Sequence, residues 1–553
     1  MVNVKNLFGM AVMATALVGC SSNDNLAPDG NEGNKDGAAY ASFTINLPTT
    51  RATRVAGDPT FAEGDAKEYE VKNGTILIFT NDGKFVTSAQ LGNMNPWKDI
   101  KTDGVTTAAT ATVQLSGVEV GGNYQALVLL NNDVDASTSK VKLPLAGESY
   151  ADWNANAANA TAAYTKTDYI FMANAPKYTG TTTEPTTLVP VANICASREQ
   201  AEAKAATTVY VERGLAKVTM QNFKADGYSI AAGTYKGDKV EIKNWQLDVT
   251  NKSTFPVHQT SGLIRGFADI WGTPRFYDET STAFKRVYWG VDPNYNDPKY
   301  QDLANCKTAF NMITKDKVVG EAGNAHPQYC LENTFDLDNM KQGQTTRVVF
   351  KAVYTPNGFT APETFYKIGN NTAIWDAAKL AQQIKTVALK AMDITTADEQ
   401  AKYSVDLSKG SNISGVAGLH KIEAENITFT GEGESKVKPG VVDAINEKLG
   451  LKEAGISTYL NGEAYYIARI KHFNELTPWN AGEAYGIENG KYLGRYGVLR
   501  NNWYDLSVNS ISGLGYPDVP EVKPNMPDDE NEQYINVEVK ILDWAKRSQS
   551  IDL

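Results

Sequence analysis

The chain is short of histidine, of cysteine and of positive charge. Its 553 residues include only four histidines and four cysteines, and the formal net charge at pH 7 is −11. The lysines are scattered among the acids, and no basic stripe occurs. A nucleic-acid partner would require such a stripe. We therefore expect a protein that does not bind nucleic acid.

The sequence also lacks the motifs that carry catalysis. None of the histidines sits in a metal-binding pair, and the GxSxG, HExxH, CxxC and P-loop patterns are missing. Acidic clusters such as PDDENE lack the spacing of an EF-hand loop, so solvated carboxylates explain them better than calcium ligands do. Two carboxylates at the right separation could serve a glycosidase, but the sequence alone does not show the distance between them. We predict a protein without enzymatic activity, cofactor or metal.

Cysteine is too scarce for a disulfide framework. One of the four, Cys20, lies near the start of the chain, which leaves Cys195, Cys306 and Cys330. An odd number of cysteines cannot pair completely. A bridge between Cys306 and Cys330 is one option, and buried free thiols are the other.

No apolar run is long enough to span a membrane comfortably. The opening MVNVKNLFGMAVMATALVGC has an early lysine, a short apolar run and small residues before a cysteine, so residues 1–19 read as a secretory signal peptide. Leu17–Cys20 resembles the lipobox of bacterial lipoproteins, which implies cleavage before Cys20 and acylation of that residue. An ordinary signal peptide with an incidental cysteine is the alternative. Residues 20–38 are expected to form a lipidated flexible tether.

Short alternating apolar runs are abundant and are separated by turn signals. Period-two alternation is typical of strands with one buried face, and its recurrence favours β-sandwiches. The chain is longer than one core usually supports. We place an N-terminal β-sandwich domain at residues 39–206 and a C-terminal one at residues 207–516, with the boundary near Ala206.

One stretch departs from the β pattern. Residues 372–392, TAIWDAAKLAQQIKTVALKAM, have apolar side chains at helical spacing, and Thr372 or Asn371 could cap the helix. The apolar face consists of Ile374, Ala377, Ala381, Ile384 and Ala388. We predict a short helical insertion in the second domain that covers one of its sheets, with an interaction role as the less favoured alternative.

The first alternating run is YASFTINLP, residues 40–48. Its apolar face consists of Phe43, Ile45 and Leu47. The polar stretch TTRATRVAGDPT follows and contains Arg51 and Arg54 between turn signals. We expect a strand followed by an exposed loop.

The last alternating run stands apart from the others. The segment before it, YPDVPEVKPNMPDDENE, is rich in proline and acid and has no apolar periodicity, so it is expected to be extended and solvated. QYINVEVKILDW then alternates again. Its apolar positions are Ile535, Val537, Val539 and Ile541, with Trp544 beyond them. Residues 517–553 are therefore predicted to be a tether with a detached strand, while an ordinary strand of the same domain is the alternative.

Several segments resemble, in the same order, the fimbrilins of Bacteroidia, which are the subunits of type V pili. These segments are the lipobox, the first strand with its arginine loop, VYVERGLAKVTM, YCLENTF, TTRVVFKAVY, YGVLRNNWYDLSVNSISGLGYP and the final strand. The most specific positions are Arg500, Asn501, Asn502 and Tyr504, and Glu332, Asn333 and Thr334 after Tyr329. The likeness covers nearly the whole chain and is greatest to the stalk subunit of the minor fimbria, but residues 370–460 depart from it.

The resemblance implies an all-β fold with two tandem transthyretin-like β-sandwich domains. It implies a precursor carried to the outer membrane by lipid on Cys20, and an arginine-specific protease that cuts after Arg54 or Arg51 and removes the first strand. Arg54 is preferred because small residues follow it. The donor strand from Ile535 to Ile541, with Trp544, would then fill the groove of another copy.

The partners implied are further copies of the chain, head to tail, together with accessory pilus subunits and receptors on host or bacterial surfaces. The mature subunit would be part of a cell-surface fimbria that supports adhesion or biofilm formation. Two alternatives remain open. One is a tip or anchor subunit of the same pilus, and the other is a surface glycan-binding lipoprotein that uses the nine tryptophans as an exposed platform.

Overall fold

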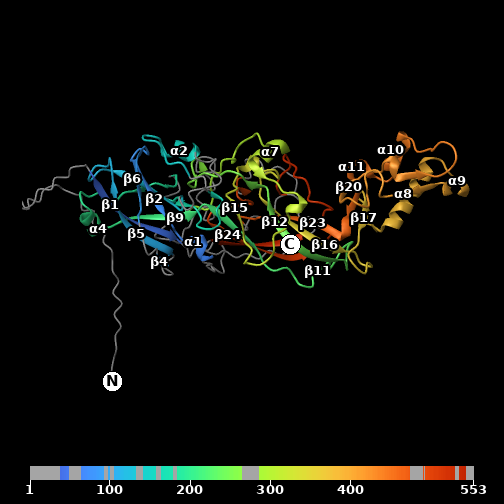
Figure 1. The fold of residues 1–553 in the computed structure, drawn as a ribbon, viewed down its shortest axis with the longest axis horizontal. Coiled ribbons are helices and arrows are strands. Elements are labelled where there is room, and N and C mark those ends of the chain that lie inside the picture. The colour runs from blue at the N-terminus through green and yellow to red at the C-terminus, as the bar shows by residue number, and fades with distance from the viewer. Residues whose placement is uncertain are drawn as a thin grey trace, which may run out of the picture.

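Strands dominate the molecule, as the alternating sequence predicts. The computed structural model describes residues 38–48, 64–92, 98–99, 105–132, 141–156, 164–178, 184–263, 286–473, 490, 492–529 and 535–543. The N-terminal sheet lies at one end, the C-terminal sheets lie in the middle, and a helical insertion forms the other end (Figure 1). The prediction of an all-β fold with packed sheets and a helical insertion is confirmed.

The N-terminal strands form one sheet with the order β3-β2-β6-β7-β9-β1-β5-β4, and β8 pairs with β6. The sheet encloses a core to which strands from both of its halves contribute. The strands are β1 (Ala39–Pro48), β2 (Gly74–Thr80), β3 (Phe85–Gln90), β4 (Lys98–Asp99), β5 (Val105–Leu115), β6 (Tyr124–Leu130), β7 (Met172–Asn174), β8 (Val189–Pro190) and β9 (Thr207–Arg213). Short helices α1 (Ala66–Tyr69), α2 (Tyr150–Asn156) and α4 (Arg198–Ala203) lie around it.

The C-terminal domain is a sandwich of two four-stranded sheets, β15-β10-β24-β25 and β11-β12-β16-β23, which share one core. The first sheet contains β10 (Leu215–Met220), β15 (Gln328–Leu331), β24 (Asn502–Ile511) and β25 (Ile535–Asp543). The second contains β11 (Tyr228–Ser229), β12 (Lys239–Asp248), β16 (Arg347–Thr355) and β23 (Glu463–Arg469). Helix α7 (Leu303–Ala309) precedes β14 (Phe310–Asn311), which pairs with β13 (Thr250–Asn251), and the single turns η2 (Lys315–Lys317) and η3 (Leu337–Asn339) follow.

The chain passes from one domain to the other at Gly214. Strand β9 pairs with β1 and β7 of the N-terminal sheet, whereas β10, which starts one residue later, pairs with β15 and β24. The alternating runs in the sequence predict this boundary near Ala206. Since β9 and β10 read as one alternating run, the sequence does not show that its two halves enter different sheets.

A second apolar core joins the two domains. In β2, Ile76 and Ile78 face the N-terminal core, while Leu77 and Phe79 belong to a cluster that includes Leu215 and residues beyond it. The other C-terminal members of this cluster are Val257 and Leu331. Burial on both faces explains why β2 and β6 are apolar without alternation. The two sandwiches therefore pack as one body.

The insertion joins β16 to β23, which are adjacent antiparallel strands. It has its own sheet, β18-β17-β22-β20, and a core separate from that of the sandwich. The sheet strands are β17 (Phe365–Ile368), β18 (Ile374–Trp375), β20 (Gly418–His420) and β22 (Ile456–Tyr459), and β19 (Tyr403–Val405) pairs with β21 (Ile427–Phe429). The helices are α8 (Ala377–Ala391), α9 (Ala397–Ala401), α10 (Pro439–Lys448) and α11 (Leu451–Ala454), with the turns η4 (Ala424–Asn426) and η5 (Leu460–Gly462).

Helix α8 confirms the predicted helix but corrects its start and its packing. Asp376, rather than Thr372 or Asn371, caps the helix by accepting a hydrogen bond from the Lys379 N–H at 2.8 Å. The preceding Ile374–Trp375 forms strand β18. The buried face packs against the insertion's own sheet instead of covering a sheet of the sandwich.

Replacing Asp376 with Ala is expected to destabilise α8 locally by about 0.5–2 kcal/mol, because the first turn loses its cap. Amide hydrogen exchange should become faster in Ala377–Ala391 and stay unchanged in β16 and β23. Asp376→Ser, which can still cap the helix, is the matched control. An equal loss of protection in β16 would show that the insertion does not have a separate core.

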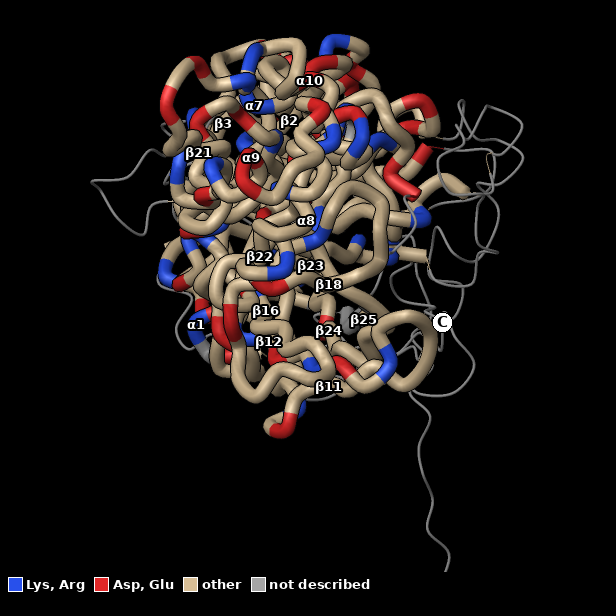
Figure 2. Tube along the Cα trace, turned by 90° about the vertical axis from the view of Figure 1, so that its right-hand side faces the viewer, with Lys and Arg blue, Asp and Glu red and all other residues tan. Residues whose placement is uncertain are grey.

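Charges of both signs are interspersed on the end of the molecule that carries the insertion (Figure 2). Among the described residues, no helix has the length and apolar character needed to cross a membrane.

Candidate functional site

Strand β1 is the first strand of the described residues, yet it lies inside the sheet. It pairs antiparallel with β5, from Ala39 opposite Leu115 to Pro48 opposite Val105. On its other edge, Phe43–Asn46 pairs in parallel with Thr207–Tyr210 of β9. Both backbone edges of β1 are therefore engaged, and β5 and β9 meet only through it. We call the space between β5 and β9 the β1 slot.

The inner face of β1 completes the N-terminal core. Phe43 and Ile45 are fully buried and Leu47 is 3% exposed, and they lie in one cluster with side chains of β2, β6 and β9. Burying an aliphatic or phenyl side chain of this size stabilises a fold by about 1.5–3 kcal/mol. The three side chains that the sequence singled out therefore hold β1 in its slot.

Helix α4 covers part of the outer face of β1. Ser42 is only 6% exposed, and its hydroxyl donates a hydrogen bond to the Ala201 carbonyl oxygen at 2.9 Å. The Thr112 hydroxyl lies 2.7 Å from the same Ser42 oxygen. Arg198 donates to the Thr112 carbonyl oxygen at 2.8 Å, and its guanidinium lies over the Tyr40 ring. The helix therefore forms a roof above the Ser42 position of the slot.

A buried thiol borders the slot. Cys195 exchanges two backbone hydrogen bonds of 2.8 Å with Tyr40 of β1, and its side chain is 4% exposed. Cys306 and Cys330 are also buried and unbridged, so the option of a bridge between them is excluded.

The segment that follows the arginine stretch is fixed at the junction of the two domains. Glu68 of α1 lies 2.6 Å from the Lys217 ammonium of β10, and both side chains are nearly fully buried. The Tyr329 hydroxyl donates to the same carboxylate, and Arg213 Nε donates to the Glu68 carbonyl oxygen at 2.9 Å. Burial alone would raise the pKa of Glu68, but the charge of Lys217 and hydrogen bonds from Lys217 and Tyr329 hold it below its usual value. Glu68 thus anchors α1 to the C-terminal domain.

The two most specific sequence motifs meet at the same junction. Arg500 lies 3.3 Å from the buried Glu332 carboxylate. Asn501 adopts a left-handed backbone conformation with φ 59°, and its side-chain oxygen accepts a hydrogen bond from the Arg213 N–H. Asparagine tolerates this conformation better than most residues do. Asn333 pairs with Val498 through two backbone hydrogen bonds of 2.8 and 3.0 Å. Asn501 therefore links this motif to β9 of the N-terminal sheet, while the other contacts join segments of the C-terminal domain.

Strand β25 lies along β24 of its own domain. The pairing is antiparallel, from Ile535 opposite Ile511 to Asp543 opposite Asn502. Among the described residues, β24 is the only strand that pairs with β25, so β25 is an edge strand. Val537 is 4% exposed and belongs to the C-terminal core.

The segment before β25 is bound to the domain, although the sequence suggested a solvated tether. We call residues 513–529 the strap. Arg469 donates to the Asp528 carbonyl oxygen at 2.9 Å, and the Thr345 hydroxyl donates to the Asp528 carboxylate, also at 2.9 Å. Asp528 is fully buried, and Asp529 accepts a hydrogen bond from the Tyr496 hydroxyl. Two acids of the PDDENE cluster therefore attach the strap to the domain through buried hydrogen bonds, and the strap is part of the domain.

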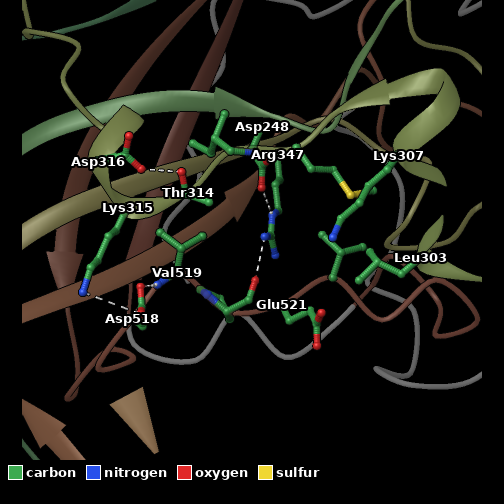
Figure 3. Close-up of a pocket in the computed structure, with 14 residues that line it drawn as sticks. Asp248, Leu303, Lys307, Thr314, Lys315, Asp316, Arg347, Asp518, Val519 and Glu521 are labelled. Carbon is green, nitrogen blue, oxygen red and sulfur yellow. Dashed lines mark hydrogen bonds and ion pairs between the residues drawn. The ribbon is translucent and has the colours of Figure 1, made fainter. Parts of the chain in front are cut away.

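A cavity of about 460 Å³ lies between the strap and the adjacent sheet (Figure 3). Buried Arg347 spans it, donating to Asp248 at 2.8 Å and to the Pro520 carbonyl oxygen of the strap at 2.7 Å. Lys315 and Asp518 form a second link of 3.9 Å. The charged groups thus pair across the cavity and tie the strap down. In the described part of the chain, no group of three or more His, Cys, Asp or Glu side chains is placed to hold a metal ion.

Four of the residues singled out in the sequence lie outside the described residues. These are Cys20, Arg51, Arg54 and Trp544. For Ile535, Val539 and Ile541 the structure gives the backbone pairing with β24. The contacts of α4 with β1 and of the strap with the C-terminal domain could not be predicted from the sequence, because they join segments that are distant along the chain.

Residues 457–550 match the family model described as major fimbrial subunit protein type IV, fimbrillin, C-terminal. No curated protein matches the chain. The resemblance to the fimbrilins is thus confirmed for this part of the chain.

Three solved bacterial structures align with much of the chain at low identity. A proposed cell adhesion protein of Parabacteroides distasonis is 12% identical, with 92% of this chain and 99% of that chain covered and a TM-score of 0.36. The tip fimbrial protein Mfa3 of Porphyromonas gingivalis is 10% identical, with 91% and 100% covered and a TM-score of 0.28. A fimbrial assembly protein of P. distasonis is 12% identical, with 57% and 98% covered and a TM-score of 0.24.

Proposed function

We propose that the chain is a structural subunit of a cell-surface fimbria that polymerises by exchanging strands between copies. The precursor would be carried to the outer membrane by lipid on Cys20 and cut after Arg54 or Arg51. Loss of β1 would then open the slot for β25 of a second copy. The observation that carries the proposal is the position of β1, which is the first strand of the described residues, lies inside the sheet and is followed directly by the arginine stretch.

The open slot would bind a strand strongly. Removal of β1 leaves backbone groups unpaired on β5 and β9 and exposes the sites that Phe43, Ile45 and Leu47 had filled. Such a groove is unstable alone. Four aliphatic side chains from β25 would contribute roughly 6–12 kcal/mol before ordering costs, and the main-chain ladder adds to this.

The edge position of β25 makes the transfer favourable. On β24 the strand uses one backbone edge, whereas between β5 and β9 it would use both. Each copy would offer β25 at one place and a slot at another, so the contact is head to tail and does not close. Contacts of that kind produce filaments. Accessory pilus subunits and surface receptors would be the further partners.

The proposal is tested by treating the purified precursor with an arginine-specific protease and looking for a ladder of multimers that resist SDS. We expect a ladder with the full chain and none when residues 534–553 are deleted. Deletion of residues 548–553 alone, which spares β25, is the matched control and should keep the ladder. A ladder from the longer deletion would show that β25 is not the donor.

Cys195 should report whether the slot is filled. A chain from Val55 to Gln533 lacks β1 and β25, so its slot is empty. Alkylation of Cys195 is expected to be at least about tenfold faster than in the precursor, because the neighbouring strand β1 no longer shields the thiol. A synthetic peptide spanning Tyr534–Trp544 should restore protection. Cys330, which lies in the other core, is the internal control. Equal reactivity of Cys195 with and without the peptide would contradict the proposed exchange.

A further inference from the structure

We infer that helix α4 sets the register in which the donor strand enters, with Asn536 taking the place of Ser42. This inference rests on the proposed function and adds the alignment of the two copies. It places β25 in the β1 slot in the same direction as β1. The strand would then pair antiparallel with β5 and in parallel with β9, as β1 does.

The roof of α4 restricts one position of the slot. Ser42 lies beneath Ala201 and beside Thr112 and is 6% exposed, whereas the next outward residues, Thr44 and Asn46, remain partly exposed. A side chain at the Ser42 position must therefore be short, uncharged and able to form hydrogen bonds. The positions of Thr44 and Asn46 can accept longer or charged side chains.

The sequence of β25 meets these conditions in one register. Its polar face begins with Asn536, which is short and uncharged, and continues with Glu538 and Lys540. With Asn536 at the Ser42 position, the two charged residues reach the partly exposed positions. The apolar residues Ile535, Val537, Val539 and Ile541 then take the places of Ala41, Phe43, Ile45 and Leu47.

The other registers place an unsuitable side chain under α4 or in the apolar core. A shift by two residues in one sense puts Glu538 under α4 and Asp543 into the site of Leu47. A shift in the opposite sense puts Tyr534 under α4. Reversing the strand so that the same four apolar residues still face inward puts Lys540 under α4. Burying an unpaired charge or an oversized side chain is unfavourable, so β25 is not expected to enter the slot in these registers.

Cysteine cross-linking tests the register directly. The Ser42 and Thr112 oxygens are 2.7 Å apart, so cysteines at these two positions would lie within disulfide range. We would combine Thr112→Cys with Asn536→Cys, Glu538→Cys or Lys540→Cys in a Cys195→Ser background, cleave each precursor and oxidise the multimers. The Asn536→Cys pair is expected to give a covalent ladder on boiled, non-reducing gels. The other two pairs should not cross-link.

The outcomes separate the inference from the proposed function. Cross-linking at Glu538→Cys or Lys540→Cys, or at none of the three with the SDS-resistant ladder intact, would overturn the register but leave strand exchange standing. A parent chain that forms no ladder at all would overturn the proposed function itself.

The rate of assembly gives a second test. Asn536→Ser should assemble within about twofold of the parent rate, while Asn536→Trp, too large for the space under α4, should assemble at least about tenfold more slowly. If Asn536→Trp assembled at the parent rate, α4 would not restrict the size of the side chain at the Ser42 position.

Discussion

Changing Arg51 and Arg54 together to Ala is expected to leave the precursor monomeric after exposure to an arginine-specific protease. Both arginines lie in the polar stretch between β1 and α1. In the proposed mechanism, an intact stretch keeps β1 tethered in its slot, so that no second strand would enter. The SDS-resistant ladder should therefore be lost completely, and mass spectrometry should find the first strand still attached.

A relocated cut provides the control. Replacing residues 51–54 with the recognition sequence of an unrelated protease should make assembly depend on that protease instead. The single variants Arg51→Ala and Arg54→Ala would show which arginine is cut. A normal ladder from the double variant would place the switch elsewhere in the chain.

Cleavage alone would not empty the slot. After a cut, β1 keeps its backbone pairs with β5 and β9 and its buried side chains, at about 1.5–3 kcal/mol for each large apolar residue. Its departure is then best coupled to the arrival of β25, pair by pair. Glu68 holds α1 at the domain junction throughout, because its contacts with Lys217 and Arg213 lie beyond the cut. In the proposed exchange, the slot would thus change its occupant without loosening the contact between the two domains.

Local patterns were enough to predict individual elements of the fold and its all-β class. Alternation identified β1 and β25, and the helical spacing around Ile384 identified α8. These patterns depend on which face of an element is buried, and that information is local.

Long-range contacts explain what the sequence could not show. The strap reads as a solvated tether because its proline and acid have no periodicity, yet Arg469 and Thr345 bind Asp528 from other elements. In the same way, the run from β9 to β10 looks continuous although its halves enter different sheets. In the β1 slot, alternation predicts the inward side chains, whereas the cover over Ser42 comes from Ala201, which is distant along the chain.

Replacing Arg500 with Met is expected to lower the free energy of unfolding by about 3–5 kcal/mol, because a buried ion pair loses one partner. Arg500 is 2% exposed and faces the fully buried carboxylate of Glu332. Its guanidinium also donates to the Thr254 hydroxyl at 3.0 Å and to the carbonyl oxygens of Phe255 and Pro256 at 2.9 and 3.2 Å. Methionine keeps part of the volume but leaves these acceptors unpaired. Equilibrium urea unfolding followed by tryptophan fluorescence would measure the change.

Two further variants identify the cause of that loss. Glu332→Met combined with Arg500→Met removes both charges and should recover part of the lost stability, since the uncompensated carboxylate is then gone. Asp168→Asn breaks an exposed ion pair with Lys67, whose side chains are 64% and 57% exposed, and should change stability by less than about 1 kcal/mol. If Arg500→Met were as mild as Asp168→Asn, the buried pair with Glu332 would contribute little to stability. The pair joins the two most specific motifs, because Glu332 directly follows β15 and Arg500 lies just before β24. A large loss of stability in Arg500→Met would therefore show that this buried contact holds the two segments together.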